Sequence, residues 1–306
     1  MAKALRDTIK DLIKHHLTKN KGIVMGQCLT AVGWVGGTLP ELYEKDGMIE
    51  LSMADVAGGG IAVGAALQNK KPIYVIRYQG FNWYNAPMIV NYACKSKEIW
   101  KVPCSMLIRG IAMEGGIGPV AGSSHHSLYY RMPGIKIFSP MTPGEYKKIY
   151  QYFMNSDDVI YVSEHRGSFG NNKELRDKID KKNHITIFAI SITRFEAEKV
   201  RAHFKKLKIN INIVHIFQIK PLIIKKRWIS SLKESKYGGI VLDDDYEDGI
   251  TKNIAHELYL KSKKTVITMG LKNKSAGFSR NTDNLPPTAN EIIKKIKKII
   301  LKKNNN

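Results

Sequence analysis

The stretch from Leu51 to Leu67 reads LSMADVAGGGIAVGAAL, and it decides how the rest of the chain is interpreted. Its acid, Asp55, precedes three consecutive glycines and a helix-like run of small apolar residues. The helix dipole stabilises an acid at a helix N-terminus, whereas each glycine inside a helix costs about 1 kcal/mol. The glycines therefore predict a close approach by another backbone or by a flat ligand. Glycine spacing alone favours a tight contact between helices, with Asp55 in solvent.

The composition is that of an ordinary globular protein. The chain has 306 residues, enough for one large or two medium domains, with 43% hydrophobic and 25% charged residues. No apolar run reaches the roughly 18 residues of a membrane-spanning helix, and the N-terminus does not resemble a signal peptide. Three cysteines without a CxxC pair indicate a reducing, cytoplasmic location and no metal site.

The net charge of +22 raises the question of nucleic-acid binding. The excess is lysine rather than arginine, and it is spread along the chain or gathered on amphipathic segments such as Glu291–Lys303, EIIKKIKKIILKK. No basic motif with interleaved base-stacking aromatics occurs in the sequence. We therefore expect solvated lysine faces, and neither nucleic acid nor membrane as a partner.

Short apolar segments alternate with helix-like segments along the chain. In the first half, strands are expected at residues 22–25, 72–78, 104–109, 135–138 and 159–163, and one helix at 83–96. In the second half, strands are expected at 185–190, 209–216, 239–242 and 265–268. Such alternation predicts parallel β-α-β units and an α/β fold of two doubly wound domains. The domains are expected at residues 1–167 and 184–306, with the polar stretch 168–183 as a linker.

Several short motifs follow one another in a fixed order. They are GIAVGAA at Gly60–Ala66, NYACK at Asn91–Lys95, VPCSMLIRG at Val102–Gly110, His126–Ser127, PGIKIFSP at Pro133–Pro140, VSEHR at Val162–Arg166, IKPL at Ile219–Leu222 and VLDDD at Val241–Asp245. Together they resemble the β subunit of the thiamine-diphosphate-dependent 2-oxo-acid dehydrogenase decarboxylase component, and more distantly the C-terminal two-thirds of transketolase. The resemblance implies a pyrimidine-binding domain followed by a transketolase-like C-terminal domain.

The resemblance also implies thiamine diphosphate as the cofactor, which the protein positions and tunes electrostatically. The family has a glutamate just before the glycine-rich helix, where it exchanges a proton with the aminopyrimidine ring. Asp55 stands at that position, and its side chain is shorter by one methylene, about 1.5 Å. The family's stacking aromatic corresponds to Tyr78 or Phe81, for which core packing is the alternative.

A histidine of the family handles protons on the substrate side of the cofactor. His125 or His126, in the glycine-rich loop from Gly110 to Ser127, matches this residue. His165 and Arg166 are weaker candidates for charge at a subunit interface.

The metal-binding motif of the family is missing from this chain. The family holds the diphosphate through Mg²⁺ with a GDG motif and a downstream Asn pair, whereas this chain has only KDG at Lys45–Gly47 and EDG at Glu247–Gly249, without that pair. The resemblance therefore implies that a separate α-type subunit holds the metal. The active site would lie between chains, and an α2β2 heterotetramer is the expected assembly.

The segment His125–Gly134 reads HHSLYYRMPG and contains no acid. Transketolases follow their active-site histidines with acidic residues that hold sugar hydroxyls, so the resemblance favours decarboxylation of a 2-oxo acid with acyl or aldehyde transfer. Arg131, Tyr129 and Tyr130 suit a substrate carboxylate. Two alternatives stay open. One is the C-terminal subunit of a split transketolase, and the other is a non-catalytic partner of the same fold, because Asp55 departs from the family's glutamate.

Overall fold

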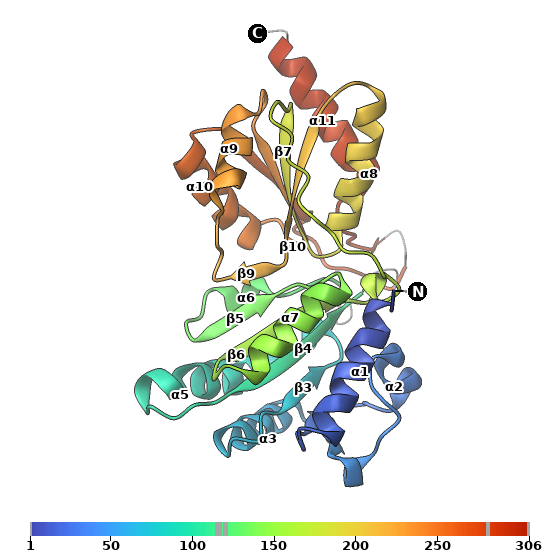
Figure 1. Ribbon diagram of the computed structural model, residues 1–306, viewed down its shortest axis with the longest axis vertical. Helices are drawn as coiled ribbons and strands as arrows, with labels where there is room; N and C mark the ends of the chain where they lie inside the picture. Colours follow the sequence, from blue (N-terminus) through green and yellow to red (C-terminus); the bar gives the residue numbers. More distant parts are fainter. Residues whose placement is uncertain (1, 114–117, 119–121, 280–281, 305–306) are drawn as a thin grey trace. The chain divides into compact units, whose positions relative to one another are not determined.

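The computed structural model describes residues 2–113, 118, 122–279 and 282–304. These residues divide into two compact units (Figure 1). The first unit holds residues 2–113, 122–174 and 218–221, and the second holds 118, 175–217, 222–279 and 282–304. The stretch 168–183, expected as a linker, is thus divided between the two units.

Within the described residues, the first unit holds a seven-stranded sheet in the order β2-β1-β3-β4-β6-β5-β9. The strands are β1 (Val24–Gly26), β2 (Met48–Glu50), β3 (Ile73–Ile76), β4 (Met106–Ala112), β5 (Ile135–Phe138), β6 (Val159–His165) and β9 (Gln218–Lys220). Neighbours pair in parallel, except that β9 runs antiparallel to β5. Every residue of β3, β4 and β6 is buried, as expected for parallel strands covered on both faces.

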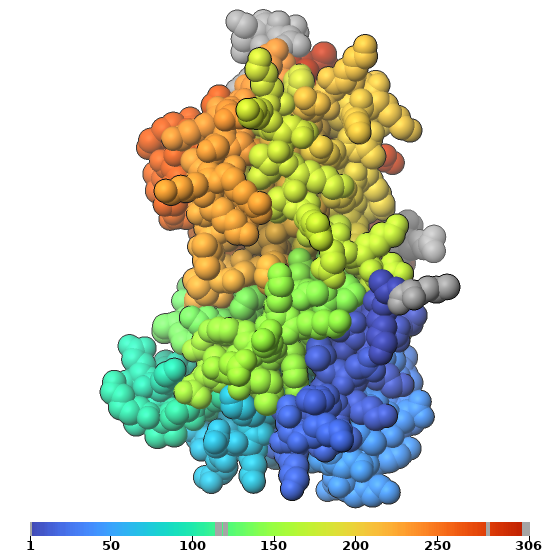
Figure 2. Space-filling view, in the orientation of Figure 1, coloured from blue at the N-terminus to red at the C-terminus, as the bar shows by residue number. Residues whose placement is uncertain are grey.

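Helical segments cover both faces of this sheet. They are α1 (Leu5–Thr18), α2 (Ala31–Gly37), η1 (Glu44–Asp46), α3 (Asp55–Leu67), η2 (Gln79–Phe81), α4 (Asn82–Met88), η3 (Ile89–Ala93), α5 (Cys94–Ile99), α6 (Ser127–Tyr130), α7 (Pro143–Met154) and η4 (Arg166–Ser168). Right-handed crossovers put α3 and α4 on one face and α7 on the other, because the chain traverses the sheet in opposite directions through them. Figure 2 shows the face where α1 adjoins α7.

The segment 83–96 is not the single helix that the sequence predicts. It is divided into α4, the π-helix η3 and α5. Pro87 lies inside α4, and because proline has no backbone N–H, it removes one of the donors of a regular helix. The wider π-turn follows directly after it, over Ile89–Ala93. Asn85, which lies in α4 ahead of Pro87 and the π-turn, contacts Asp55 of α3.

The glycines of α3 explain how closely this helix packs. A Cβ atom at Gly58 would lie 3.0 Å from the Tyr74 hydroxyl of β3, and one at Gly59 would lie 3.2 Å from Oδ1 of Asn85. Both distances are shorter than ordinary van der Waals contact, so only glycine fits without displacement. The close approach predicted for these glycines is therefore made to β3 and α4, whereas a Cβ at Gly64 would have no described atom within 4 Å.

The second unit holds, in its described part, a four-stranded parallel sheet in the order β11-β10-β7-β8. Its elements are β7 (Ile185–Ile190), α8 (Thr193–Lys206), β8 (Ile211–Ile216), α9 (Lys226–Glu234), β10 (Gly239–Tyr246), α10 (Ile250–Ser262), β11 (Val266–Leu271) and α11 (Ala289–Asn304). Helices α8 and α11 pack together on one face, and α9 and α10 pack together on the other (Figure 1).

Both sheets are built from β-α-β crossovers with helices on either face, so the predicted α/β fold with two doubly wound sheets is confirmed. Among the described residues, none of the helices combines the length and the apolar character that a membrane crossing requires.

Candidate active site

A pocket of about 190 Å³ opens at the carboxyl ends of β1 and β3. Its wall is formed by the residues that follow β1, the start of α3, the end of β3 and η2. They are Gln27, Cys28, Met53, Asp55, Tyr74, Val75, Ile76, Arg77, Tyr78 and Phe81. Ligands of parallel α/β sheets bind at this edge, because the loops that leave the strands converge there. The three residues that the sequence assigns to the cofactor, Asp55, Tyr78 and Phe81, thus share one pocket.

Asp55 is the first residue of α3 and is half-buried rather than fully solvated. Asn85 Nδ2 donates a hydrogen bond to Asp55 Oδ1 at 2.8 Å and another to the Phe81 carbonyl at 3.0 Å. The Tyr74 hydroxyl donates to Asn85 Oδ1 at 2.7 Å. Burial, together with the charge of Asp55, raises the pKa of Tyr74, which stays a neutral donor. These contacts fix the Asn85 amide, and the amide fixes the Asp55 carboxylate.

Tyr78 precedes the turn η2, Phe81 is the last residue of that turn, and both are half-buried. Their ring centroids lie 6.1 Å apart with a 40° angle between the planes. The guanidinium of Arg77 lies 5.4 Å from the centroid of the Tyr78 ring, a cation–π arrangement. Neither ring is enclosed in the core, so both present aromatic surface to the pocket that holds Asp55.

His125 and His126 lie just before α6, and neither is among the described residues that line the Asp55 pocket. The ring of His126 is buried, and its Nδ1 is 3.1 Å from the Ser163 hydroxyl of β6. The ring of His125 is half-buried, edge-on to Trp83, and its Nε2 is 3.2 Å from the Ser123 hydroxyl. The loop from Gly110 to Ser127 is only partly within the described residues.

The other side chains that the sequence singles out have different surroundings. His165 ends β6, and its Nδ1 accepts a hydrogen bond from the Gly167 amide at 3.1 Å, as a cap of η4. Tyr129 is fully buried with its ring centroid 4.7 Å from that of Tyr161, so it has a packing role and is not placed to contact a substrate. Arg131 and Arg166 are exposed.

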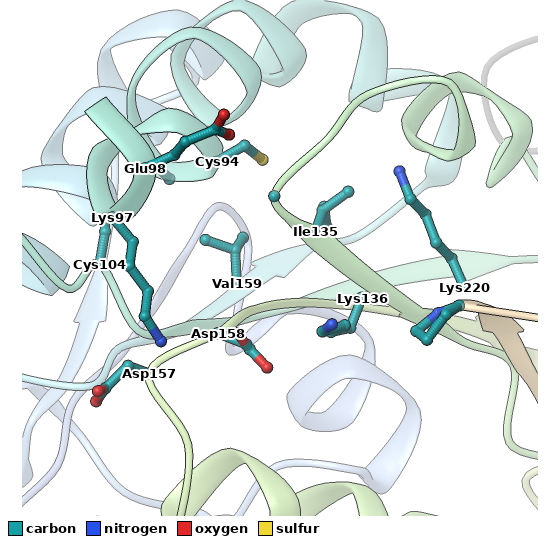
Figure 3. Close-up of a pocket in the computed structure, with 13 residues that line it drawn as sticks. Cys94, Lys97, Glu98, Cys104, Ile135, Lys136, Asp157, Asp158, Val159 and Lys220 are labelled. Atoms are coloured by element: carbon teal, nitrogen blue, oxygen red, sulfur yellow. The ribbon is translucent and has the colours of Figure 1, made fainter. Parts of the chain in front are cut away.

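A second cavity, of about 310 Å³, lies at the opposite edge of the same sheet (Figure 3). Its wall includes Ile135 and Val159, the first residues of β5 and β6, so it lies at the amino ends of the strands. Three lysines and three carboxylates line it, which gives it no net charge. They are Lys97, Lys136, Lys220, Glu98, Asp157 and Asp158. Its position at the carboxyl ends of the strands therefore favours the Asp55 pocket as the cofactor site.

Three buried polar residues at the site were not identified from the sequence. Asn85 holds Asp55, while Gln79 and Ser163 connect η2, β6 and the histidine loop. Gln79 lies between Tyr78 and Phe81 in the sequence, and a polar residue at that position could have indicated a hydrogen-bonding role at the site. Ser163 lies inside the VSEHR motif, but the sequence marks neither it nor Asn85 as a contact of the site, because an isolated serine in a strand or asparagine in a helix is equally common on a surface.

A parallel α/β sheet with a pocket at its carboxyl edge is an arrangement found in many cofactor-binding domains. The chain belongs to the family described as "Transketolase, pyrimidine binding domain", whose sequence profile matches residues 1–171, more than half of its length. The match covers the first unit's α/β region and confirms the family resemblance drawn from the ordered motifs.

Curated relatives and solved structures extend this result. The chain is 26% identical to the 2-oxoisovalerate dehydrogenase subunit beta of Bacillus subtilis over 176 residues, which cover 53% of this chain and 52% of the relative. It is 22% identical to the pyruvate dehydrogenase E1 component subunit beta of Rickettsia bellii over 273 residues, 82% of each chain. The matched part spans about half the length of the first relative. In fold, the chain is similar to a split-gene transketolase, with a TM-score of 0.74 at 15% identity over 98% of this chain and 99% of that one.

Proposed function

We propose that this chain is the β-type subunit of a thiamine-diphosphate-dependent enzyme that decarboxylates a 2-oxo acid and transfers the resulting acyl or aldehyde group. The observation that carries the proposal is that Asp55, Tyr78 and Phe81 line one pocket at the carboxyl edge of the sheet. They lie within the residues that the family profile matches. The names of the relatives, 2-oxoisovalerate and pyruvate dehydrogenase β subunits, support the substrate class.

The residues of the pocket fit an aminopyrimidine ring. The pocket offers a fixed carboxylate, two aromatic faces and the apolar wall of Val75 and Ile76. When bound, thiamine diphosphate supplies the carbon nucleophile that carries the decarboxylation. Asp55 would hold and exchange a proton with a ring nitrogen, while Tyr78 or Phe81 would stack on the ring and exclude water.

Of the two histidines, we assign the proton transfer on the substrate side to His126. General acid–base catalysis requires a ring held in one orientation. Ser163, in the central part of the sheet, contacts Nδ1 of His126 and holds the buried ring. The half-buried ring of His125 lies against Trp83 instead.

We further propose that an α-type subunit carries the GDG motif and holds Mg²⁺ and the diphosphate, in an α2β2 heterotetramer. Asp55 is the only carboxylate among the described residues that line the pocket. Three apolar side chains at the start of α3 and on it are largely exposed: Met53 (79%), Val56 (52%) and Ile61 (51%). Exposed apolar surface next to a site is typical of a subunit interface. The split-gene transketolase structure is described as an inactive β4 tetramer, which supports the need for a second kind of chain.

We also propose that the enzyme works in the cytoplasm without a nucleic-acid partner. The three cysteines are free, as expected where thiols stay reduced. The lysines of α11 that contribute to the positive charge, such as Lys294 and Lys298, lie exposed on one helix face.

A split transketolase is the second candidate function. The full-length similarity in fold to the split-gene transketolase favours it. A non-catalytic partner of the same fold remains the third, since the carboxylate of Asp55 has a shorter reach than the family's glutamate.

The test is to purify the chain with a co-expressed α-type subunit that carries the GDG motif. The complex is assayed with pyruvate and 2-oxoisovalerate, using a dye as electron acceptor, and with xylulose 5-phosphate and ribose 5-phosphate. We expect turnover of a 2-oxo acid only. Turnover of the sugar phosphates alone would establish the transketolase function, and no turnover by a complex that binds thiamine diphosphate would favour the non-catalytic one.

A further inference from the structure

The side chain of Gln79 connects the cofactor pocket with the histidine loop. Gln79 is the first residue of η2, between Tyr78 and Phe81, and it is fully buried. Its Oε1 accepts a hydrogen bond from the backbone amide of His125 at 2.7 Å. Its Nε2 donates to Ser163 Oγ at 2.8 Å, the shortest of three contacts, with the carbonyls of Gly110 at 3.2 Å and Glu164 at 3.3 Å.

These contacts determine how the Ser163 hydroxyl is oriented. An amide NH₂ group can only donate, so Ser163 Oγ must accept from Gln79. The hydroxyl hydrogen of Ser163 then points elsewhere. Among the described residues, the acceptor within hydrogen-bond distance of it is Nδ1 of His126, 3.1 Å away.

The orientation of Ser163 in turn decides which ring nitrogen of His126 carries the proton. A nitrogen that accepts a hydrogen bond is unprotonated, so a neutral ring that accepts at Nδ1 carries its hydrogen on Nε2. We propose that Gln79 is a positioning residue that fixes His126 in the Nε2–H tautomer through Ser163. The inference rests on the proposed function, in which His126 transfers protons, and it makes Nε2 the nitrogen that carries the hydrogen of the neutral ring.

The hydrogen-bond part is tested on the isolated chain, labelled with ¹⁵N-histidine. The nitrogen shifts of His126, identified by their loss in His126→Gln, report the ratio of the two tautomers at a pH where the ring is neutral. In Gln79→Met, Ser163 Oγ loses the amide donor that orients its hydroxyl, so it can accept from Nδ1–H of His126 instead. We expect the Nδ1–H fraction to rise about fivefold, the factor that one net hydrogen bond contributes.

Two further variants separate this effect from general loosening. Asn82→Leu removes another buried amide of the same region, one that donates to the Tyr161 hydroxyl at 2.7 Å, and it should leave the tautomer ratio unchanged. Ser163→Ala keeps the contact between Gln79 and His125 and removes only the hydroxyl. It should shift the ratio towards that of free histidine, and it replaces Gln79→Met as the test if that variant does not fold.

The proposal is overturned if the tautomer ratio of His126 is unchanged in a folded Gln79→Met or Ser163→Ala chain. It is also overturned if Asn82→Leu shifts the ratio as much as Gln79→Met does. In the reconstituted complex, Gln79→Met should lower kcat about tenfold with little change in KM, as expected for an effect on proton transfer rather than on binding. The two proposals fail separately. A tautomer shift in a complex without 2-oxo-acid turnover refutes only the function, whereas turnover with an unmoved tautomer refutes only the role of Gln79.

Discussion

At the scale of single residues, the site depends on polar side chains that hold other side chains in place. Asp55 alone would rotate freely at the start of α3, but Asn85 donates to its Oδ1, and Tyr74 and the Phe81 carbonyl fix the Asn85 amide. A carboxylate held in this way loses little entropy when a ligand binds. Asp55 is shorter than the glutamate of the family, and Asn85 fixes the direction of its carboxylate.

The first prediction concerns Asp55. In Asp55→Asn the remaining side-chain oxygen still accepts from Asn85, so the fold should be retained. The rate of deuterium exchange at the thiazolium carbon of bound cofactor in the assembled complex should fall by about 100-fold or more, because the proton-exchanging group is gone. Asp55→Glu should be tolerated. Exchange at the wild-type rate in Asp55→Asn would show that another group activates the cofactor.

At the scale of elements, α3 has two different sides. Gly58 and Gly59 face β3 and α4 so closely that a Cβ would have to displace Tyr74 or Asn85, whereas Gly64 is exposed with open space where a Cβ would be. Glycine therefore has a packing function at positions 58 and 59, whereas at position 64 the described residues show no contact that requires glycine.

The second prediction follows from this difference. Gly64→Ala should raise the free energy of unfolding of the isolated chain by about 0.5–1 kcal/mol, because alanine restricts the unfolded chain and meets no neighbour. Gly59→Ala brings a Cβ within 3.2 Å of Asn85 Oδ1. It should gain no stability, and it should slow cofactor exchange by displacing the amide that holds Asp55. Urea unfolding measures the first effect, and equal stabilisation by both variants would contradict the packing argument.

The contact between α1 and α7 includes a buried histidine. His16 is almost fully buried, its Nε2 lies 3.1 Å from the Lys71 carbonyl and its Nδ1 lies 3.3 Å from the Tyr150 hydroxyl. Burial lowers the pKa of His16 from 6.5 to about 4. The folded chain therefore prefers the neutral ring, whereas the unfolded chain takes up a proton at a higher pH.

The third prediction is a loss of stability in acid. Because the pKa of His16 is lower in the folded chain, its contribution is fully present above about pH 6.5 and is lost as the pH falls towards about 4. Over this window the free energy of unfolding should fall by up to about 3 kcal/mol. The decrease should be smaller in His16→Phe, while His15→Gln, at the exposed neighbouring position, should behave like the wild type. Equal slopes for all three chains would contradict the assignment.

At the scale of the whole molecule, the described pocket contains part of what the cofactor needs. It supplies a carboxylate and aromatic surface, but among the residues that line it only Asp55 bears a negative charge that a metal would require. Apolar residues beside it, such as Met53, are exposed in the single chain. This is the arrangement that the proposal of a site shared with an α-type subunit leads us to expect.

The fourth prediction is that the isolated chain binds thiamine diphosphate weakly and turns nothing over. Without an α-type subunit, no group is expected to hold the diphosphate and Mg²⁺. Titration calorimetry on the pure chain, with and without Mg²⁺, should give no measurable binding at micromolar cofactor. Tight Mg²⁺-dependent binding by the chain alone would mean that the metal site lies in this polypeptide.

The sequence by itself determined the fold class and the family. Apolar strands that alternate with amphipathic helices favour a parallel sheet covered by helices, because each element must bury its apolar side. Motifs in a fixed order, from GIAVGAA to VLDDD, marked the family, and the resemblance to that family indicated Asp55, Tyr78 and Phe81, which share a pocket.

Only the tertiary structure decided how those residues are held. Asn85 meets Asp55 because α3 and α4 pack against each other, although the two residues lie 30 positions apart in the sequence. Gln79 reaches Ser163 across 84 positions of sequence, because β4 and β6 are neighbours in the sheet and η2 lies at their carboxyl ends. Hydrogen bonds between residues so far apart depend on strand order and side-chain direction, and local sequence patterns carry neither.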